Sequence, residues 1–148
     1  MITSLFLPDE TATDRLACQL APRLQAGQAL LLSGPIGSGK THFSRAVIRA
    51  LLGDGTEVPS PTFTLVQTYA TEEPEIWHAD LYRLSHPDEV IELGLEAAFS
   101  SAICLVEWPD RLGDLVPDGA LHMAFATEGE GRRVTFTPPG HPLLEGLA

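Results

Sequence analysis

The sequence predicts an α/β fold, in which a sheet of short strands is flanked by helices around one phosphate-binding loop. Residues 34–41 read Gly-Pro-Ile-Gly-Ser-Gly-Lys-Thr, which matches the pattern G-x-x-x-x-G-K-[ST]. An apolar run over 28–32 precedes this motif, and apolar residues at helical spacing follow it. A chain of 148 residues can form one core, so we expect a single domain over 1–140 and a loosely held tail over 141–148.

Before the loop, the pattern predicts a strand over 2–7 and a helix over 9–25. We expect the helix to begin at Thr11 or Thr13, because hydroxyl side chains cap helix N-termini. Pro22 should bend this helix or end it early, because proline lacks the backbone N–H that a helix interior needs.

After the loop, apolar residues recur at helical spacing from Phe43 to Leu51, and Gly53 is the expected stop. The stretch 85–88, Ser-His-Pro-Asp, resembles a capping box and predicts a helix to about Leu93. The strands expected further along the chain are 63–69, 75–79, 102–106, 120–126 and 134–137, the last two forming a hairpin.

Composition excludes several classes of function. Nine basic residues against twenty acidic ones give a net charge of −11, which argues against broad, direct binding of nucleic acid. No apolar run approaches the length of a membrane helix, and the N-terminus lacks the charged start of a signal peptide, so we expect a cytoplasmic protein without membrane contact. The two cysteines and most histidines show no metal-ligand spacing.

The residue types of the loop suit a triphosphate. Gly34, Gly37 and Gly39 let the backbone turn with positive φ, so that its N–H groups form an anion-binding nest. Lys40, the only lysine of the chain, can reach the β and γ oxygens, and the Thr41 hydroxyl can hold Mg²⁺.

Two carboxylates follow predicted strands. Glu107 ends the apolar run 103–107, as in a Walker B element that holds Mg²⁺, although an ordinary strand-end carboxylate would look the same. Asp80 shares a side with His78 in a strand. It could orient water or bridge to Mg²⁺. The bare residues favour a structural role, in which Asp80 pairs with Arg83 or caps a turn.

Two further segments have open interpretations. Thr62, in the proline-bounded stretch 60–64, could contact the γ-phosphate and Mg²⁺ as in nucleotide switches, or could belong to a plain turn. Trp108 could lie near the nucleotide, or could serve as a core or surface aromatic residue.

Taken together, these motifs resemble those of the TsaE family, formerly YjeE, the ATPases of bacterial tRNA threonylcarbamoyladenosine (t6A) biosynthesis. The loop is a general motif, whereas the combination in this order and spacing is specific. The matching segments are 8–13, 34–45, 60–66, 78–84 and 105–108.

The resemblance implies ATP hydrolysis, with ATP or ADP and Mg²⁺ as cofactors and with Thr41 and Glu107 as metal ligands. It implies that Asp80 and Thr62 lie near the γ-phosphate and that Lys40 contacts the phosphate that is transferred. The partners it implies are the TsaB–TsaD heterodimer, with tRNA met only through that complex. The nucleotide-binding residues it implies are Gly34, Ile36, Gly37, Ser38, Gly39, Lys40, Thr41, His42, Thr11, Trp108 and Arg133. In this family the segment near Thr11 and the pair Arg132–Arg133 are the ones expected to flank the adenine.

Three other classes of protein compete with this interpretation. A GTPase needs the guanine-recognition motif N-K-x-D, and this chain has no asparagine and no second lysine. A small-molecule kinase of the P-loop class usually has a lid with several arginines, and Arg111 is the only arginine between Arg83 and Arg132. A nucleotide-gated binding module overlaps with the favoured function, because an ATPase that serves a complex can be slow alone.

Overall fold

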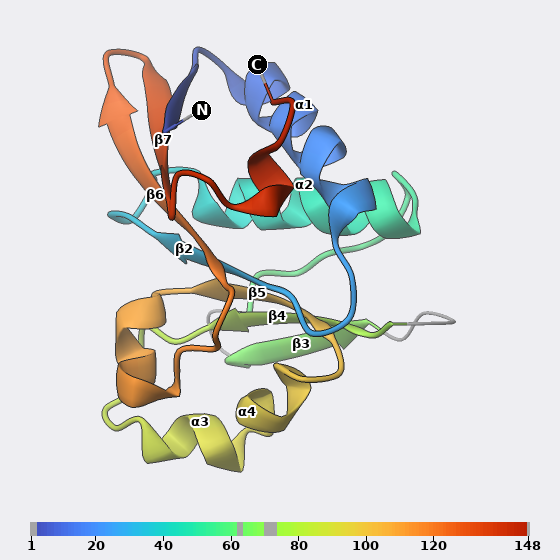
Figure 1. The fold of residues 1–148 in the computed structure, drawn as a ribbon, viewed down its shortest axis with the longest axis vertical. Coiled ribbons are helices and arrows are strands. Elements are labelled where there is room, and N and C mark those ends of the chain that lie inside the picture. Colours follow the sequence, from blue (N-terminus) through green and yellow to red (C-terminus); the bar gives the residue numbers. More distant parts are fainter. Residues whose placement is uncertain (1–2, 62–63, 70–73, 148) are drawn as a thin grey trace. The chain divides into compact units, whose positions relative to one another are not determined.

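The computed structural model describes residues 3–61, 64–69 and 74–147, and its elements are labelled in Figure 1. The chain forms two compact units, which are described separately. The loop unit consists of Met1–Leu24, Ser33–Val58 and Leu121–Ala148, and the carboxylate unit of Gln25–Leu32 and Pro59–Ala120. Among the described residues, no helix is long and apolar enough to cross a membrane.

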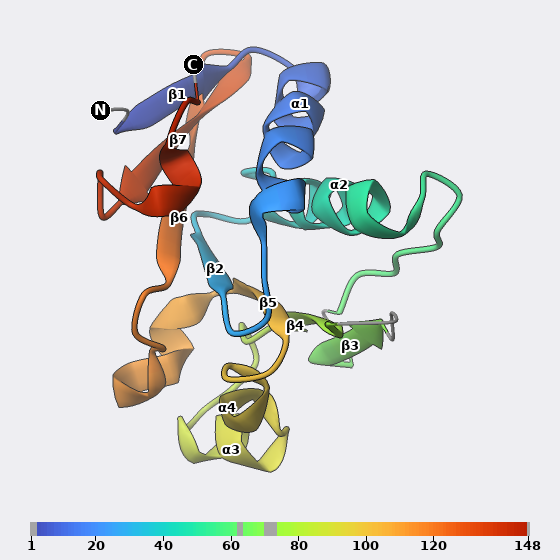
Figure 2. The same cartoon turned by 45° about the vertical axis from the view of Figure 1, so that its right-hand side comes forward.

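The loop unit combines a small antiparallel sheet with two packed helices. Strand β7 (Gly131–Thr137) pairs with β1 (Ser4–Leu7) on one side and with β6 (Leu121–Glu128) on the other. Helix α1 (Glu10–Leu20) packs against α2 (Lys40–Leu52), as Figure 2 also shows. The predicted hairpin is confirmed, with longer strands than its apolar pattern indicated.

The N-terminus of α1 differs from the prediction. Asp9 is the N-cap, and its carboxylate accepts a hydrogen bond of 2.9 Å from the backbone N–H of Ala12. Thr11 and Thr13 therefore lie inside the helix. The early end of α1 is confirmed, because Pro22 falls in a short 3₁₀ helix, η1 (Ala21–Arg23).

The C-terminal residues are packed, whereas a loose tail was expected over 141–148. They form the 3₁₀ helix η3 (Pro142–Leu144), and both Leu143 and Leu144 are buried. Arg23 donates a hydrogen bond of 3.0 Å to the carbonyl oxygen of Leu143, 120 residues away in the chain. Long-range contacts of this kind leave no signal in the local sequence.

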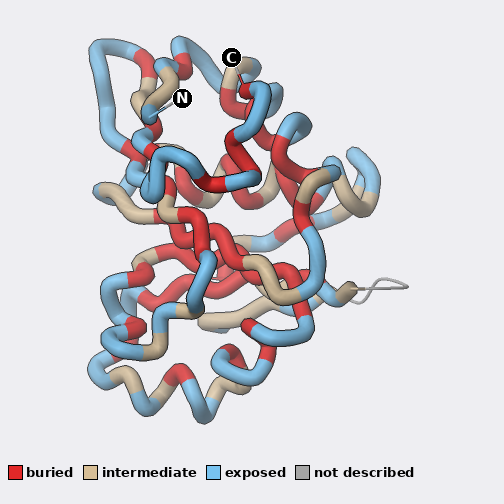
Figure 3. Tube along the Cα trace, viewed as in Figure 1, coloured by how far each residue is buried: buried red, intermediate tan, exposed pale blue. Residues whose placement is uncertain are grey.

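The carboxylate unit contains four neighbouring strands in the order β2-β5-β4-β3. Strands β2 (Ala29–Ser33), β5 (Ile103–Glu107) and β4 (Ile76–Asp80) are parallel, and β3 (Val66–Tyr69) is antiparallel to β4. Strand β2 crosses into the loop unit at its last residue. Every residue of β5 is buried, which explains the apolar run that precedes its terminal Glu107 (Figure 3).

One face of these strands packs against short helices. Helices α3 (Asp88–Glu92) and α4 (Leu95–Ala98) and the 3₁₀ helix η2 (Pro109–Leu115) contribute to one core with the strands. The core residues on the strands are Ala29, Leu31, Ala79, Cys104 and Val106. Because side chains alternate along a strand, the residues between them point to the opposite face, and His78, Asp80 and Glu107 are among these.

The helical part of the carboxylate unit is more divided than predicted. Gly94, with φ of 83°, ends the first helix as expected, but α4 follows it directly. The prediction of a capping box is wrong. Pro87 occupies the N-cap and makes no side-chain hydrogen bond there, and the Ser85 hydroxyl donates to the Glu89 carboxylate at 2.7 Å. Thr62 and Phe63 lie outside the described residues.

Candidate nucleotide site

The glycine-rich loop has the conformation that its sequence predicts. It follows β2 and leads into α2, and φ is 137° at Gly34, 82° at Gly37 and 105° at Gly39. A Cβ atom at Gly34 would lie 2.3 Å from the carbonyl oxygen of Phe125, so no other residue fits there. Both requirements for glycine, backbone angle and space, are therefore met at this position.

Lys40 is folded into its own loop. Its side chain is almost completely buried, and Nζ donates hydrogen bonds to the carbonyl oxygens of Gly34 at 2.6 Å and Pro35 at 3.0 Å. The ammonium group thus holds the loop backbone at the N-terminus of α2. This end of a helix has unpaired N–H groups and a partial positive charge.

The residues of the loop fit a polyphosphate. The Ser38 hydroxyl is buried and has no hydrogen-bond partner among the described residues, so it offers a donor. Apart from the adjacent residues of the chain, no atom of the described residues lies within 4 Å of the position that a Cβ would take at Gly37 or Gly39, which leaves the backbone there accessible. Thr41, the second residue of α2, is half-buried.

The two adjacent arginines of β7 have different partners. Arg132 Nη2 donates to the carbonyl oxygen of Gly37 in the loop at 3.0 Å. Arg133, also expected near the nucleotide, forms a two-bond fork with Glu128 at 2.9 and 3.0 Å. Its guanidinium also lies over the Phe6 ring, with 5.8 Å to the centroid. Alternation along the strand separates the two side chains, a signal that the sequence already contained.

The fork between Glu128 and Arg133 shifts the pKa values of both groups so that each favours its charged form. The hydrogen bond from Arg133 lowers the pKa of Glu128, and the same bond raises the pKa of Arg133. Both side chains are exposed, so this pair contributes little to stability.

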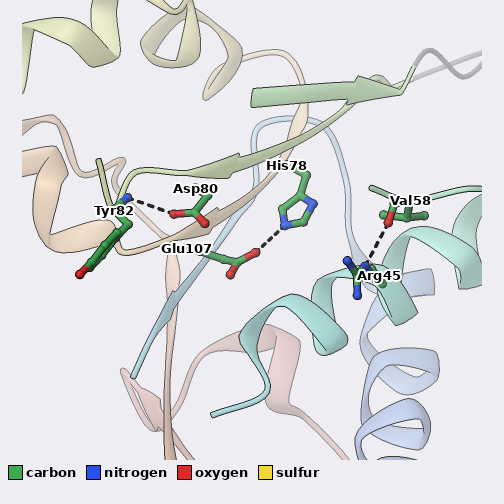
Figure 4. A network of polar contacts seen from close by, with 6 residues as sticks. All are labelled: Arg45, Val58, His78, Asp80, Tyr82 and Glu107. Atoms are coloured by element: carbon green, nitrogen blue, oxygen red, sulfur yellow. Dashed lines mark hydrogen bonds and ion pairs between the residues drawn. The ribbon is translucent and has the colours of Figure 1, made fainter. Parts of the chain in front are cut away.

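Three other expected nucleotide contacts lie in the loop unit without a feature that marks a ligand. Ile36 is exposed at the tip of the loop, and Thr11 is exposed on α1. His42 Nε2 lies 2.9 Å from the Asp14 carboxylate and joins α2 to α1. Further along, Arg45 Nε donates to the carbonyl oxygen of Val58 at 3.0 Å and holds the chain that leaves α2 (Figure 4).

The two predicted carboxylates lie side by side in the carboxylate unit. Asp80 ends β4 and Glu107 ends β5, and they are register partners in this parallel pair. Glu107 is also in register with Leu32 of β2, one residue before Ser33 and two before the first glycine of the loop. Asp80 and Glu107 are both buried. Ligands in sheets of this kind bind at the carboxyl ends of the strands.

Each carboxylate has a distinct partner (Figure 4). Glu107 Oε2 lies 2.7 Å from Nε2 of His78, which is completely buried. Asp80 Oδ1 accepts a hydrogen bond of 3.0 Å from the backbone N–H of Tyr82. One oxygen of Asp80 thus caps the turn after β4, the structural role that the sequence left open for it. No pattern in the sequence assigned a role to His78.

Trp108 occupies an unusual backbone position directly after Glu107. It has φ of 60° and ψ of 55°, the left-handed region that side chains disfavour. Its ring packs against Tyr82, with centroids 4.8 Å apart and planes at 51°. The ring is half-buried and also contacts the core of the carboxylate unit.

A glycine-rich loop between a buried strand and a helix, with a carboxylate ending the adjacent parallel strand, defines the class of P-loop NTPase-like folds. The structure is similar to the crystal structure of Bacillus subtilis YdiB, with a TM-score of 0.73 and 26% identity, covering 92% of this chain and 86% of that one. The α/β fold class predicted from the sequence is thereby confirmed.

The chain belongs to the TsaE family. The model of the family described as "Threonylcarbamoyl adenosine biosynthesis protein TsaE" matches residues 7–135. A TsaE of Rickettsia felis is 38% identical over 130 residues, 88% of this chain and 76% of the relative. A TsaE of Bacillus subtilis is 34% identical over 136 residues, 90% and 83% of the two chains. Both are named for tRNA threonylcarbamoyladenosine biosynthesis, which is the process of this family.

Proposed function

We propose that this chain is a Mg²⁺-dependent ATPase that supports t6A modification of tRNA through a TsaB–TsaD complex. The observation that carries the proposal is the loop of Gly34–Thr41, with its three glycines at positive φ and the Lys40 ammonium inside it. Such a loop presents several backbone N–H groups and one cation to the phosphates of a nucleotide.

Thr41 and Glu107 are the proposed metal ligands. Both offer the hard oxygen atoms that Mg²⁺ prefers, and Glu107 is buried at the end of the strand adjacent to the one that leads into the loop. Bound Mg²⁺ would supply positive charge for the phosphate oxygens during hydrolysis.

Asp80 is the proposed residue at the γ-phosphate, together with Thr62. Its position beside Glu107 supports this role, and the bond from the Tyr82 N–H fixes the orientation of its carboxylate. A carboxylate held in this way can orient an attacking water molecule.

The proposed partners follow from the family and agree with the charge of the chain. A net charge of −11 suits a protein that meets tRNA through TsaB and TsaD, rather than by direct contact with phosphates. In this scheme TsaD transfers the threonylcarbamoyl group, and ATP hydrolysis by this chain allows repeated turnover. A small-molecule kinase is the alternative, and the scarcity of arginine between Arg83 and Arg132 argues against it.

A binding experiment tests the nucleotide site. We expect Lys40→Ala to lower the affinity for Mg·ADP at least tenfold in calorimetry, because the ammonium contacts the phosphates. Arg15→Ala, which removes one exposed positive charge on α1, is the charge-matched control and should bind like the parent. Equal affinity of the Lys40 variant and the parent would contradict the proposed site.

A reconstitution tests the biological role. We expect t6A formation by TsaB and TsaD with tRNA, threonylcarbamoyl-adenylate and ATP to continue over many turnovers only when this chain is present. Asp80→Ala should retain nucleotide affinity and lose repeated turnover, because its role is in hydrolysis. Sustained turnover with this variant would show that Asp80 only caps the turn.

A further inference from the structure

His78 is a buried polar residue to which neither the motif nor the family description assigns a role. It lies in β4, two residues before Asp80, and its side chain is completely buried. Nε2 lies 2.7 Å from Oε2 of Glu107, whose side chain is also buried. Nδ1 has no hydrogen-bond partner among the described residues. The imidazole is therefore directed at Glu107 and at no other described polar group.

The proposed metal role of Glu107 sets the direction of the hydrogen bond. A carboxylate that binds a cation is ionised and has only acceptors, so in that state the hydrogen between the two groups belongs to Nε2 of the imidazole. A bond of 2.7 Å to a charged group in a buried site is short and directional. It restricts a glutamate side chain that otherwise has three rotatable bonds.

The register of the strands explains how the two residues meet. Glu107 pairs with Asp80, so His78 lies two residues back on the same face of β4. Figure 4 shows the Glu107 carboxylate turned toward the imidazole. One carboxylate oxygen is thus held by β4, and the orientation of the other is determined by it.

We propose that His78 is a positioning residue, which orients the Glu107 carboxylate for a divalent cation. The proposal rests on the proposed function, because that assigns Glu107 to the metal. Groups that hydrogen-bond a metal ligand fix its orientation, and their loss typically lowers metal affinity about 10–100-fold. A merely structural pair would stabilise β4 against β5 without effect on the metal.

Mn²⁺ provides a direct probe, because its binding to the ADP-loaded full-length chain can be measured by electron paramagnetic resonance. We expect His78→Leu to lower Mn²⁺ affinity about 10–100-fold and to leave metal-free ADP affinity unchanged. His78→Gln should restore most of the affinity, since its amide N–H can take the place of Nε2–H. His141→Leu is the matched control and should bind Mn²⁺ like the parent. His141 is also a buried histidine, but it is the N-cap residue of η3. Unchanged Mn²⁺ affinity in His78→Leu overturns the proposal.

A double-mutant cycle tests whether His78 acts through Glu107. In a Glu107→Ala background, His78→Leu should cause no further loss of Mn²⁺ affinity. The same loss with and without Glu107 would overturn the proposal. If Glu107→Ala binds Mn²⁺ as tightly as the parent does, the proposed metal site itself is overturned. Failure of the proposed function can therefore be distinguished from failure of the proposed role of His78.

A measurement without metal or nucleotide covers the case in which His78→Leu does not fold. Nitrogen-15 NMR of the histidine side chains reports which ring nitrogen carries hydrogen, and His78→Gln assigns the signal. We expect hydrogen on Nε2 of His78 and a changed chemical shift in Glu107→Ala. A bare Nε2 with hydrogen on Nδ1 would mean that the imidazole does not donate to Glu107, and would overturn the proposal.

Discussion

Strands β2 and β5 are parallel neighbours whose ends are in register, yet the chain leaves them in two different ways. From β2 it enters the loop at Gly34, with φ of 137° and no space for a side chain. From β5 it passes Glu107 and reaches Trp108, which keeps a large side chain at φ of 60°. Lack of space determines the residue at the first exit, whereas at the second a tryptophan that packs against Tyr82 occupies a disfavoured backbone conformation.

The difference between the two strand exits is related to what each exit has to do. The exit from β2 must bring bare backbone close to other backbone, so glycine is required. The exit from β5 must hold a carboxylate, and the packed ring of the next residue fixes the chain at that point. Substitutions at either exit test this difference.

The largest effect is expected at the first exit. Gly34→Ala combines a close contact to the Phe125 carbonyl with a disfavoured backbone angle, and should destabilise the protein by about 2–6 kcal/mol. Gly37→Ala is the control for the backbone angle alone and should cost about 1 kcal/mol, because no described residue other than its chain neighbours lies within 4 Å of the added Cβ. Denaturant unfolding measures both. Equal destabilisation would show that space does not determine the residue at Gly34.

A smaller effect with an unusual order is expected at the second exit. Trp108→Ala loses the contact with Tyr82 and keeps the left-handed backbone, while Trp108→Gly loses the contact and removes the strain. The glycine variant should therefore be more stable than the alanine variant by about 1 kcal/mol. At ordinary positions alanine stabilises a protein more than glycine does. An alanine variant that is more stable than the glycine variant in thermal unfolding would therefore contradict a strained Trp108.

An effect that appears only at high pH concerns the interior of β5, and it vanishes at neutral pH. Burial raises the pKa of the Cys104 thiol to about 12, from 9.0, so the folded protein keeps the thiol protonated where the unfolded chain loses its proton. This contribution to stability is complete below pH 9 and is lost as the pH rises from 9 to about 12. At pH 10 the loss relative to Cys104→Ala should be about 1.4 kcal/mol in denaturant unfolding.

Thiol labelling at pH 8 checks the same burial independently. The exposed Cys18 should react with a thiol reagent in the native protein, and Cys104 only after unfolding. Labelling of both thiols in the native state would mean that β5 separates from its neighbours more readily than its burial indicates.

Local patterns in the sequence predicted the parts of the fold that depend on local chemistry. The motif with its flanking apolar run and helical spacing predicted β2, the loop and α2, because a phosphate-binding loop requires that frame. Pro22 and Gly53 predicted helix ends for backbone reasons alone. The choice among caps was wrong at Asp9, since several oxygen-bearing side chains in a row compete and only backbone angles decide.

The candidate site was predicted in its components and not in its contacts. The sequence by itself determined the glycines and lysine of the loop, and the placement of Asp80 and Glu107 at strand ends, because these follow from short-range spacing. The tertiary structure decided that Arg132 rather than Arg133 contacts the loop, because pairing and alternation in β7 turn the two side chains apart. It also decided that His78 meets Glu107, since only the parallel register of β4 and β5 brings together residues 29 positions apart.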